Sequence, residues 1–121
     1  MDRRPPADPE RIRDYHAHVY YRHETREAAE ALRRELEARF PSVGLGRWHD
    51  ALVGPHTRSM YQVAFAPAEF ARLVPWLLLN RGPLDVLVHP ATGDDLADHR
   101  DHAAWLGERL PLRLEALGGA D

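Results

Sequence analysis

Two histidines at alternate positions, His16 and His18, lie inside an apolar segment and form the clearest candidate site for chemistry in this chain. In a β-strand, residues i and i+2 project from the same face. Their Cα atoms would then lie about 6–7 Å apart, from a rise of roughly 3.3 Å per residue. Two imidazoles at that spacing can bind one metal ion, so the pair predicts a metal site on the first strand. The alternative is two half-exposed histidines that bond to nearby polar groups.

Three more histidines lie near the ends of predicted strands. His89 ends a later apolar segment and has the same alternation as the first pair, so it is either a further ligand or a structural histidine before a turn. His49 and His56 flank a loop, and each is a third ligand, an acid/base group or a surface histidine. An imidazole suits proton transfer because its unperturbed pKa lies close to neutrality.

A polar group near the C-terminus has the spacing of one helical face. Asp95, His99 and His102 are separated by four and by three residues. We interpret them as a structural cluster supported by the carboxylate, as a lid over the first site, or as a separate metal site. Arg58 either pairs with a carboxylate of a substrate or is a solvated arginine at the start of a strand.

Composition restricts the class of protein. The chain has 121 residues, of which 44% are hydrophobic, as expected for one soluble globular domain. A net charge of −3 gives no basic surface for nucleic acid. The sequence shows neither a long apolar run nor a signal-peptide pattern, which predicts a cytoplasmic protein without a membrane span. Cysteine is absent, so any metal must have nitrogen and oxygen ligands.

The predicted elements follow one another in the order strand, helix, strand, strand, helix, strand. This order predicts an α+β fold of the ferredoxin-like βαββαβ type, with a four-stranded antiparallel sheet and two helices on one face. A short C-terminal helix is added to it, over residues 94–106. Pro75 is expected to kink or break the second helix, and Pro90 to stop the fourth strand. The strands are expected at about 15–21, 43–49, 59–65 and 84–89, and the two main helices at about 25–39 and 67–80.

The chain is expected to form a single domain over residues 15–112. Residues 1–14 are charged and rich in proline, and we interpret them as a flexible leader. Residues 113–121 are expected to be a frayed tail.

Alternation along the strands predicts an apolar face toward the helices and a polar face opposite. Such a polar face must be solvated, covered by the C-terminal segment, or paired with a second copy of the chain. It carries His16, His18, Tyr20, Gln62, Asp85 and His89.

Seven short motifs together resemble the DOPA 4,5-dioxygenase family of aromatic ring-opening enzymes. The resemblance extends over about residues 15–112, and the ordered combination is specific where one motif alone is weak. The motifs are Tyr15-His16-Ala17-His18-Val19-Tyr20-Tyr21, Gly46-Arg47-Trp48-His49, Gly54-Pro55-His56, Met60-Tyr61-Gln62-Val63, Pro75-Trp76-Leu77, Val88-His89-Pro90-Ala91-Thr92-Gly93-Asp94 and Asp98-His99-Arg100-Asp101-His102.

The resemblance implies a homodimeric, non-haem dioxygenase of extradiol type, which uses molecular oxygen to cleave a catechol such as L-DOPA. Fe(II) is the expected metal, and Zn(II) is the alternative. The ligands it implies are His16, His18 and His89, with His49 or His56 as the group that transfers protons. Substrate contacts are expected from Tyr20, Arg58 and Gln62.

One feature departs from the usual ferrous site, which has two histidines and a carboxylate. No acidic residue is an obvious ligand, although Asp85 and Asp50 lie close in sequence to candidate histidines. Two other hypotheses therefore stay open. One is a non-catalytic metal- or small-molecule-binding dimer of the same fold, and the other is a dimerisation domain whose histidines only fill space.

Overall fold

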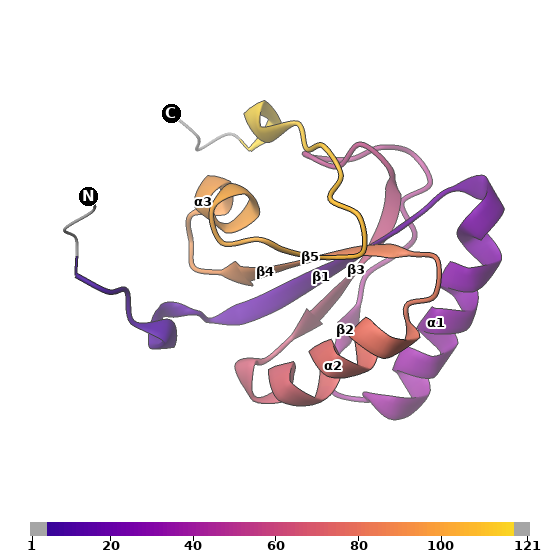
Figure 1. The fold of residues 1–121 in the computed structure, drawn as a ribbon, viewed down its shortest axis with the longest axis horizontal. Helices are drawn as coiled ribbons and strands as arrows, with labels where there is room; N and C mark the ends of the chain where they lie inside the picture. The colour runs from indigo at the N-terminus through magenta and orange to yellow at the C-terminus, as the bar shows by residue number, and fades with distance from the viewer. Residues whose placement is uncertain (1–4, 118–121) are drawn as a thin grey trace.

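The computed structural model describes residues 5–117 and has an α+β architecture, as predicted, with a five-stranded sheet instead of a four-stranded one. The two long helices cover one face of the sheet, and the C-terminal segment, with its short helix, covers the other (Figure 1). The strands are β1 (Asp14–Tyr21), β2 (Gly44–Leu45), β3 (Ser59–Phe65), β4 (Asp85–Ala91) and β5 (Ala104–Leu106). The helices are α1 (Arg26–Arg39), α2 (Phe70–Asn80) and α3 (Asp95–Arg100).

The central strand of the sheet is β1, which carries the H-x-H pair. The strand order is β2-β3-β1-β4-β5, and every neighbouring pair is antiparallel. On β1, His16 lies directly opposite His89 of β4, and His18 lies opposite Gln62 of β3. Directly opposite residues project from the same face of a sheet. The register therefore brings three histidines together, which sequence spacing alone cannot establish.

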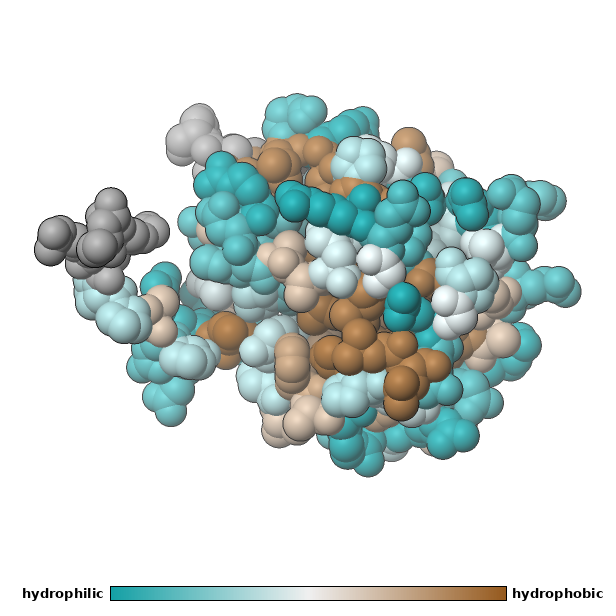
Figure 2. All heavy atoms as spheres, in the orientation of Figure 1, coloured by the Kyte–Doolittle hydropathy of each residue, from teal (hydrophilic) through white to brown (hydrophobic). Residues whose placement is uncertain are grey.

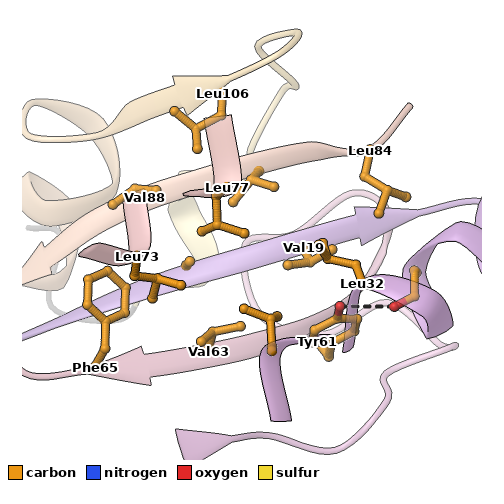
Figure 3. Close-up of a cluster of buried hydrophobic side chains, with 14 of the residues drawn as sticks. Val19, Leu32, Tyr61, Val63, Phe65, Leu73, Leu77, Leu84, Val88 and Leu106 are labelled. Atoms are coloured by element: carbon orange, nitrogen blue, oxygen red, sulfur yellow. Dashed lines mark hydrogen bonds between the residues drawn. The ribbon is translucent and has the colours of Figure 1, made fainter. Parts of the chain in front are cut away.

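The main hydrophobic core lies between the sheet and the two long helices (Figure 3). The predicted apolar face is confirmed, because Val19, Val63 and Val88 are all buried there against both helices. A buried hydroxyl is satisfied within this core, where Tyr61 donates to the carbonyl of Ala29 at 3.0 Å. The helical contribution comes from Ala29, Leu32, Leu36, Leu73 and Leu77.

The opposite face of the sheet is covered by the chain's own C-terminal segment. A second cluster of buried side chains forms there from Tyr20, Met60, Leu87 and Leu110. Of the three alternatives for this face, covering by the C-terminal segment is therefore the one observed. It encloses His18 of β1 and His89 of β4, which are each 3% exposed, whereas His16 stays half-buried.

The predicted helix over residues 94–106 is wrong in its second half. Helix α3 ends at Arg100, and residues 104–106 form β5. The physical reason is that neighbouring side chains in this segment point to opposite faces of the sheet, as in a strand. Trp105 packs against the second cluster, and Leu106 packs in the main core. Gly107 then turns the chain at a φ of 92°, and a Cβ there would lie 2.5 Å from Asp85 Oδ1.

Three other boundaries differ from the prediction. β2 is shorter than expected, although Gly46 and His49 still make backbone hydrogen bonds to β3. Pro75 does not break α2, which runs through it as one helix. Pro90 does not stop β4, because β5 pairs only with Val86–Val88 and the missing N–H of Pro90 falls on an open edge.

The predicted leader and tail are described only in part. Residues 9–11 form a 3-10 helix before β1, and residues 114–116 form another near the C-terminus. The first and last four residues lie outside the described range, and the mobility expected of both ends stays a prediction.

Hydrophobic residues also gather on the outer surface over α2 (Figure 2). Leu78 and Leu79 of this helix are 49% and 86% exposed. Within residues 5–117, none of the helices combines the length and the apolar character that a membrane span requires.

Candidate metal centre

Five histidines from four separate segments meet on the face of the sheet that the C-terminal segment covers. β1 supplies His16 and His18, and β4 supplies His89. Helix α3 supplies His99, and the loop before β3 supplies His56. The C-terminal segment holds that loop in place, since Leu112 forms a β-bridge with His56 and Thr57 donates to the carbonyl of Pro111 at 2.6 Å.

The shortest contact in this cluster joins two ring nitrogens. His18 Nε2 and His89 Nε2 lie 2.9 Å apart, and the two rings are stacked with centroids at 5.0 Å. The centroid of His56 lies 4.3 Å from that of His18, and the centroid of His99 lies 4.0 Å from that of His89. His16 completes the group, with its centroid 5.2 Å from that of His89.

Hydrogen bonds at the periphery fix the orientation of two of these rings. His89 Nδ1 donates to the carbonyl of Pro90 at 2.9 Å, and His99 Nδ1 donates to the carbonyl of Asp95 at 2.7 Å. A carbonyl oxygen can only accept, so both rings carry their proton on Nδ1 when neutral. Their Nε2 atoms are then unprotonated, which is the form that binds metals.

The cluster favours neutral imidazoles. Burial, followed by repulsion from the other histidines, holds the pKa of His18 well below its usual range. Burial is likewise the main cause that lowers the pKa of His56 and of His89 to about 4. Burial also lowers the pKa of His16. At neutral pH these rings therefore keep the lone pairs that a metal ligand needs.

Two sets of three histidines have the spacing of a metal site. Nitrogens of His16, His18 and His89 lie within 4.8 Å of one another, and so do nitrogens of His18, His56 and His99. Neither set contains a carboxylate among the residues that the structure describes. The residues present nevertheless fit a metal ion, because His18 Nδ1 is buried and has no hydrogen-bond partner within that part of the chain. Neutral imidazoles of this kind suit zinc and iron alike.

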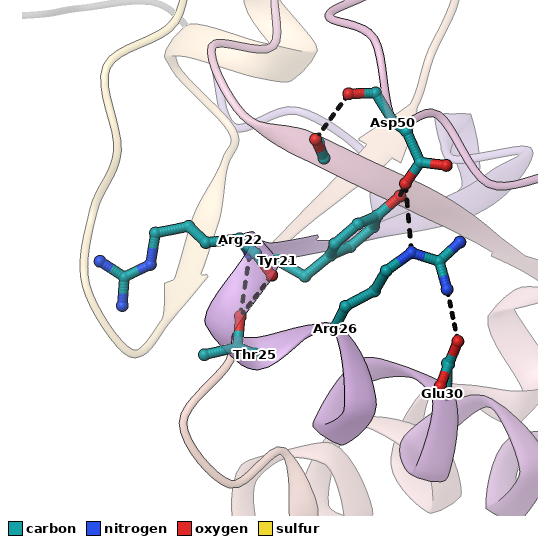
Figure 4. Close-up of polar contacts among 7 residues, drawn as sticks. Tyr21, Arg22, Thr25, Arg26, Glu30 and Asp50 are labelled. Carbon is teal, nitrogen blue, oxygen red and sulfur yellow. Dashed lines mark hydrogen bonds and ion pairs between the residues drawn. The ribbon is translucent and has the colours of Figure 1, made fainter.

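The acidic residues close in sequence to these histidines are engaged elsewhere. Asp85 pairs with Arg58 at 3.5 Å and accepts from the backbone N–H of Glu108 at 2.7 Å. Asp50 accepts from Tyr21 at 2.7 Å and lies 3.3 Å from Arg26 Nε, which also pairs through its guanidinium with Glu30 (Figure 4). The contacts of Asp50 attach the loop that carries His49 and His56 to β1 and α1.

The predicted site residues are only partly brought together. His56 joins the metal-ligand candidates, whereas His49 forms a β-bridge with Met60 and belongs to neither set of three. His49 is still near enough to contribute to the lowered pKa of His56. The expected helical group divides, because α3 ends before His102 and leaves that side chain exposed. Asp95 contributes its backbone carbonyl, and its carboxylate is exposed.

The three residues expected to contact substrate have different surroundings. Tyr20 is 1% exposed, and its hydroxyl lies 2.7 Å from His56 Nδ1. Arg58 is paired with Asp85, as described above. Gln62 is half-buried beside His18 on the neighbouring strand. Substrate contact by each of them stays a prediction.

Sequence reasoning missed the role of Asp98, which is 1% exposed. Its two carboxylate oxygens accept from the backbone N–H of Thr92 at 2.9 Å and from the Thr92 hydroxyl at 2.7 Å. This contact fixes the start of α3, and hence His99, against the end of β4. Asp94, after Thr92 and Gly93, is a typical residue for a helix start. Sequence spacing does not show, however, that the side chain of Asp98 hydrogen-bonds back to Thr92.

A cavity of about 470 Å³ lies at the outer edge of β4 and is bordered by His89. Its walls are mostly apolar, and His102 and Thr92 also line it. The apolar lining includes Ile12, Tyr15, Phe70, Val74, Val88 and Leu106. Its volume is within the usual range of about 300–1,000 Å³ for small-molecule sites.

Comparison with known proteins identifies the family. A model of the Dopa 4,5-dioxygenase family matches residues 15–116, which is most of the chain. The chain belongs to the Dopa 4,5-dioxygenase family. The cluster of histidines with metal-site spacing is compatible with this membership.

Individual relatives agree with this assignment. The chain is 34% identical over 116 residues to the DOPA 4,5-dioxygenase of Amanita muscaria, covering 88% of this chain and 50% of that protein. It is 38% identical over 114 residues to an uncharacterized 21.2 kDa protein of Botryotinia fuckeliana, covering 85% of this chain and 62% of that one. The chain thus spans about half to three fifths of these relatives' length. A crystal structure of a "putative dioxygenase" from Nostoc punctiforme is 48% identical, with a TM-score of 0.92, covering 96% of this chain and 100% of the other.

Proposed function

We propose that this chain is a non-haem, metal-dependent dioxygenase of extradiol type, which opens the ring of a catechol such as L-DOPA with molecular oxygen. The observation that carries the proposal is the set of half-buried His16 and buried His18 and His89, in which the Nε2 atoms of His18 and His89 lie 2.9 Å apart. Family membership supports the reaction class, and the neutral state of the imidazoles supports metal binding.

These three histidines would hold Fe(II), with Zn(II) as the alternative ion. Bound iron would supply the redox chemistry that lets dioxygen react with an aromatic ring. Three neutral ligands leave the positive charge of the ion uncompensated, in contrast to a site with a carboxylate ligand. An anionic catecholate is the kind of substrate that such a site favours.

The apolar cavity, whose lining includes His89 but not His16, His18 or His56, is our candidate for the place where the apolar part of the aromatic substrate binds. Tyr15, Phe70 and Val74 would contact its ring or an apolar substituent, and water would be excluded from that side. Proton transfer is assigned to His56 or His49, of which His56 touches the histidine cluster. Arg58 and Gln62 remain our candidates for orienting the substrate, and His99 with Asp95 supports the cluster from α3.

We also infer that the fold is ferredoxin-like with β5 added at the edge. The order β2-β3-β1-β4 with α1 and α2 on one face supports this assignment. We also propose a homodimer. Because the C-terminal segment covers the face of the sheet opposite the helices, the two copies must pair through another surface. Light scattering on the purified protein would give twice the monomer mass if the dimer forms.

The test is oxygen uptake by metal-free protein that has been reconstituted anaerobically with Fe(II). L-DOPA and caffeate are offered in turn, with the variants His16→Ala and His18→Ala measured in parallel. We expect uptake together with a yellow ring-opened product, and loss of both in the two variants. One bound metal per chain without uptake on any catechol would contradict the proposal and favour the non-catalytic metal-binding alternative.

A further inference from the structure

The Tyr20 hydroxyl has a single partner in the part of the chain that the structure describes, and that partner is His56 Nδ1 at 2.7 Å. Tyr20 is 1% exposed and is fixed from several sides, with its ring stacked on Trp105 at a centroid distance of 5.8 Å. Leu87 and Leu110 pack in the same cluster. The phenol can therefore neither rotate to water nor choose another acceptor.

The direction of this hydrogen bond follows from the cost of a buried, unpaired donor. If the imidazole donated to the phenol, the phenolic proton would have no acceptor among the residues that the structure describes. If Tyr20 donates instead, both groups are satisfied. Burial also raises the pKa of Tyr20, so the phenol keeps its proton. His56 Nδ1 is then the acceptor, and the proton of the neutral ring lies on Nε2.

This arrangement is the opposite of that in the two neighbouring rings. His89 and His99 donate from Nδ1 to backbone carbonyls, which leaves their Nε2 atoms unprotonated, and among the described residues His18 keeps an Nδ1 without a hydrogen-bond partner. His56 has its Nδ1 occupied by a phenol and its Nε2 protonated. Of the two sets of three histidines with metal-site spacing, the one that includes His56 is thereby disfavoured, and the one with His16, His18 and His89 remains.

We propose that Tyr20 is a positioning residue that holds His56 as its Nε2–H tautomer, so that His56 donates a hydrogen bond to an anionic oxygen of the substrate and does not bind the metal. The substrate part of this inference rests on the proposed function. A ring nitrogen of His56 lies within 4.8 Å of nitrogens of His18, a proposed ligand, and of His99, so the His56 ring lies beside the metal site. An N–H held in advance beside a developing negative charge lowers the barrier without reorganisation.

The tautomer is measured directly on metal-free protein labelled with ¹⁵N-histidine, through two-bond ¹H–¹⁵N correlation spectra. His56→Ala and His89→Ala assign the two rings. We expect His56 to be protonated on Nε2 and His89 on Nδ1. In Tyr20→Phe the His56 pattern should change while that of His89 persists. The matched control is Tyr61→Phe, which removes a buried phenol hydroxyl from the main core and should change neither. Protonation of His56 on Nδ1 in the unmodified protein would overturn the inference.

Metal binding gives a second readout that needs no turnover. Equilibrium dialysis with Co(II) should show that His56→Ala keeps one ion per chain with its affinity reduced by no more than about 10–100-fold, the scale expected for a group outside the ligand set. His89→Ala should lose stoichiometric binding. If His56→Ala lost the ion as completely as His89→Ala, His56 would be a ligand and the inference would be wrong.

Activity separates this inference from the proposed function. With a catechol that turns over, Tyr20→Phe should lower kcat about tenfold with little change in KM, and His56→Ala should lower it about 10²-fold or more. An unchanged kcat in His56→Ala would contradict its role as a donor. Absence of turnover in every form would refute the dioxygenase, while the tautomer and dialysis results would still decide the state of His56.

Discussion

The metal-free protein should lose stability steeply between pH 6.5 and pH 4. His56 and His89 are 4% and 3% exposed, and burial is the main cause that lowers the pKa of each to about 4. In the unfolded chain both rings return to a pKa of about 6.5. Between these values the unfolded state binds protons that the folded state does not, so the free energy of unfolding falls as the pH falls. The full stability is present above pH 6.5.

The magnitude follows from the size of the window. Each histidine contributes about 1.4 kcal/mol per pH unit, since one unit of pKa corresponds to 1.36 kcal/mol. Over the two and a half units between the ordinary pKa and about 4, each ring removes about 3 kcal/mol. Two rings together approach the roughly 5–15 kcal/mol that holds a domain folded. His18, whose pKa is also held well below its usual range, adds to the loss.

The assay is urea unfolding of metal-free protein, with chelator present, at half-unit steps from pH 7.5 to 4.5. We expect the free energy of unfolding to fall with a slope equivalent to at least two protons below pH 6. His56→Gln and His89→Gln should each reduce the slope by about one proton, while His23→Gln, at an exposed position, should leave it unchanged. A free energy of unfolding that stays constant from pH 6.5 to 5 would refute the reasoning that these imidazoles are buried in neutral form.

Three further changes test the packing around the site. Val74→Trp should fill the apolar cavity and raise KM for caffeate about tenfold or more in steady-state oxygen uptake. Leu79→Trp, on the exposed side of α2, should leave KM unchanged. Equal KM values for the two variants would contradict the proposed binding place. Leu73→Ala should lower the free energy of unfolding by about 2–5 kcal/mol in urea titrations, because the side chain is fully buried in the core, and a change below 1 kcal/mol would argue against that packing. Asp98→Ala should lower the free energy of unfolding by about 1–3 kcal/mol, because it leaves the two Thr92 donors without their partner. Calorimetry should show a lower melting temperature, and an unchanged melting temperature would contradict the role of this contact.

Local pattern in the sequence was enough to predict the faces of the strands. The two-residue alternation of β1, β3 and β4 assigned side chains to the helix-covered or the opposite face, and the core confirms that assignment. The same alternation placed His16 and His18 on one face, where the structure has them. These predictions succeeded because the direction of a side chain on a strand depends on its position in the chain and on little else.

The cover over the histidines could not be predicted from local pattern. The segment after β4 was expected to be one helix, and the structure divides it into α3 and the edge strand β5. Helical spacing of Asp95, His99 and His102 favoured the helix, but pairing with β4 and burial of Leu106 in the main core favour the strand. Contacts with distant residues decide such a case, because short segments have only weak preferences of their own.

The sequence by itself thus determined the residue types at the site, the strand that carries two of them, the face from which they project and, with the absence of cysteine, the chemistry of the ligands. Only the tertiary structure decided which other histidines join them. The register of β1 against β4 places His89 opposite His16, and the C-terminal segment holds the loop of His56 against the cluster. The tertiary structure also decided that Tyr20 hydrogen-bonds to His56. Register, loop path and burial depend on packing between segments far apart in the chain, and spacing along the sequence does not encode them.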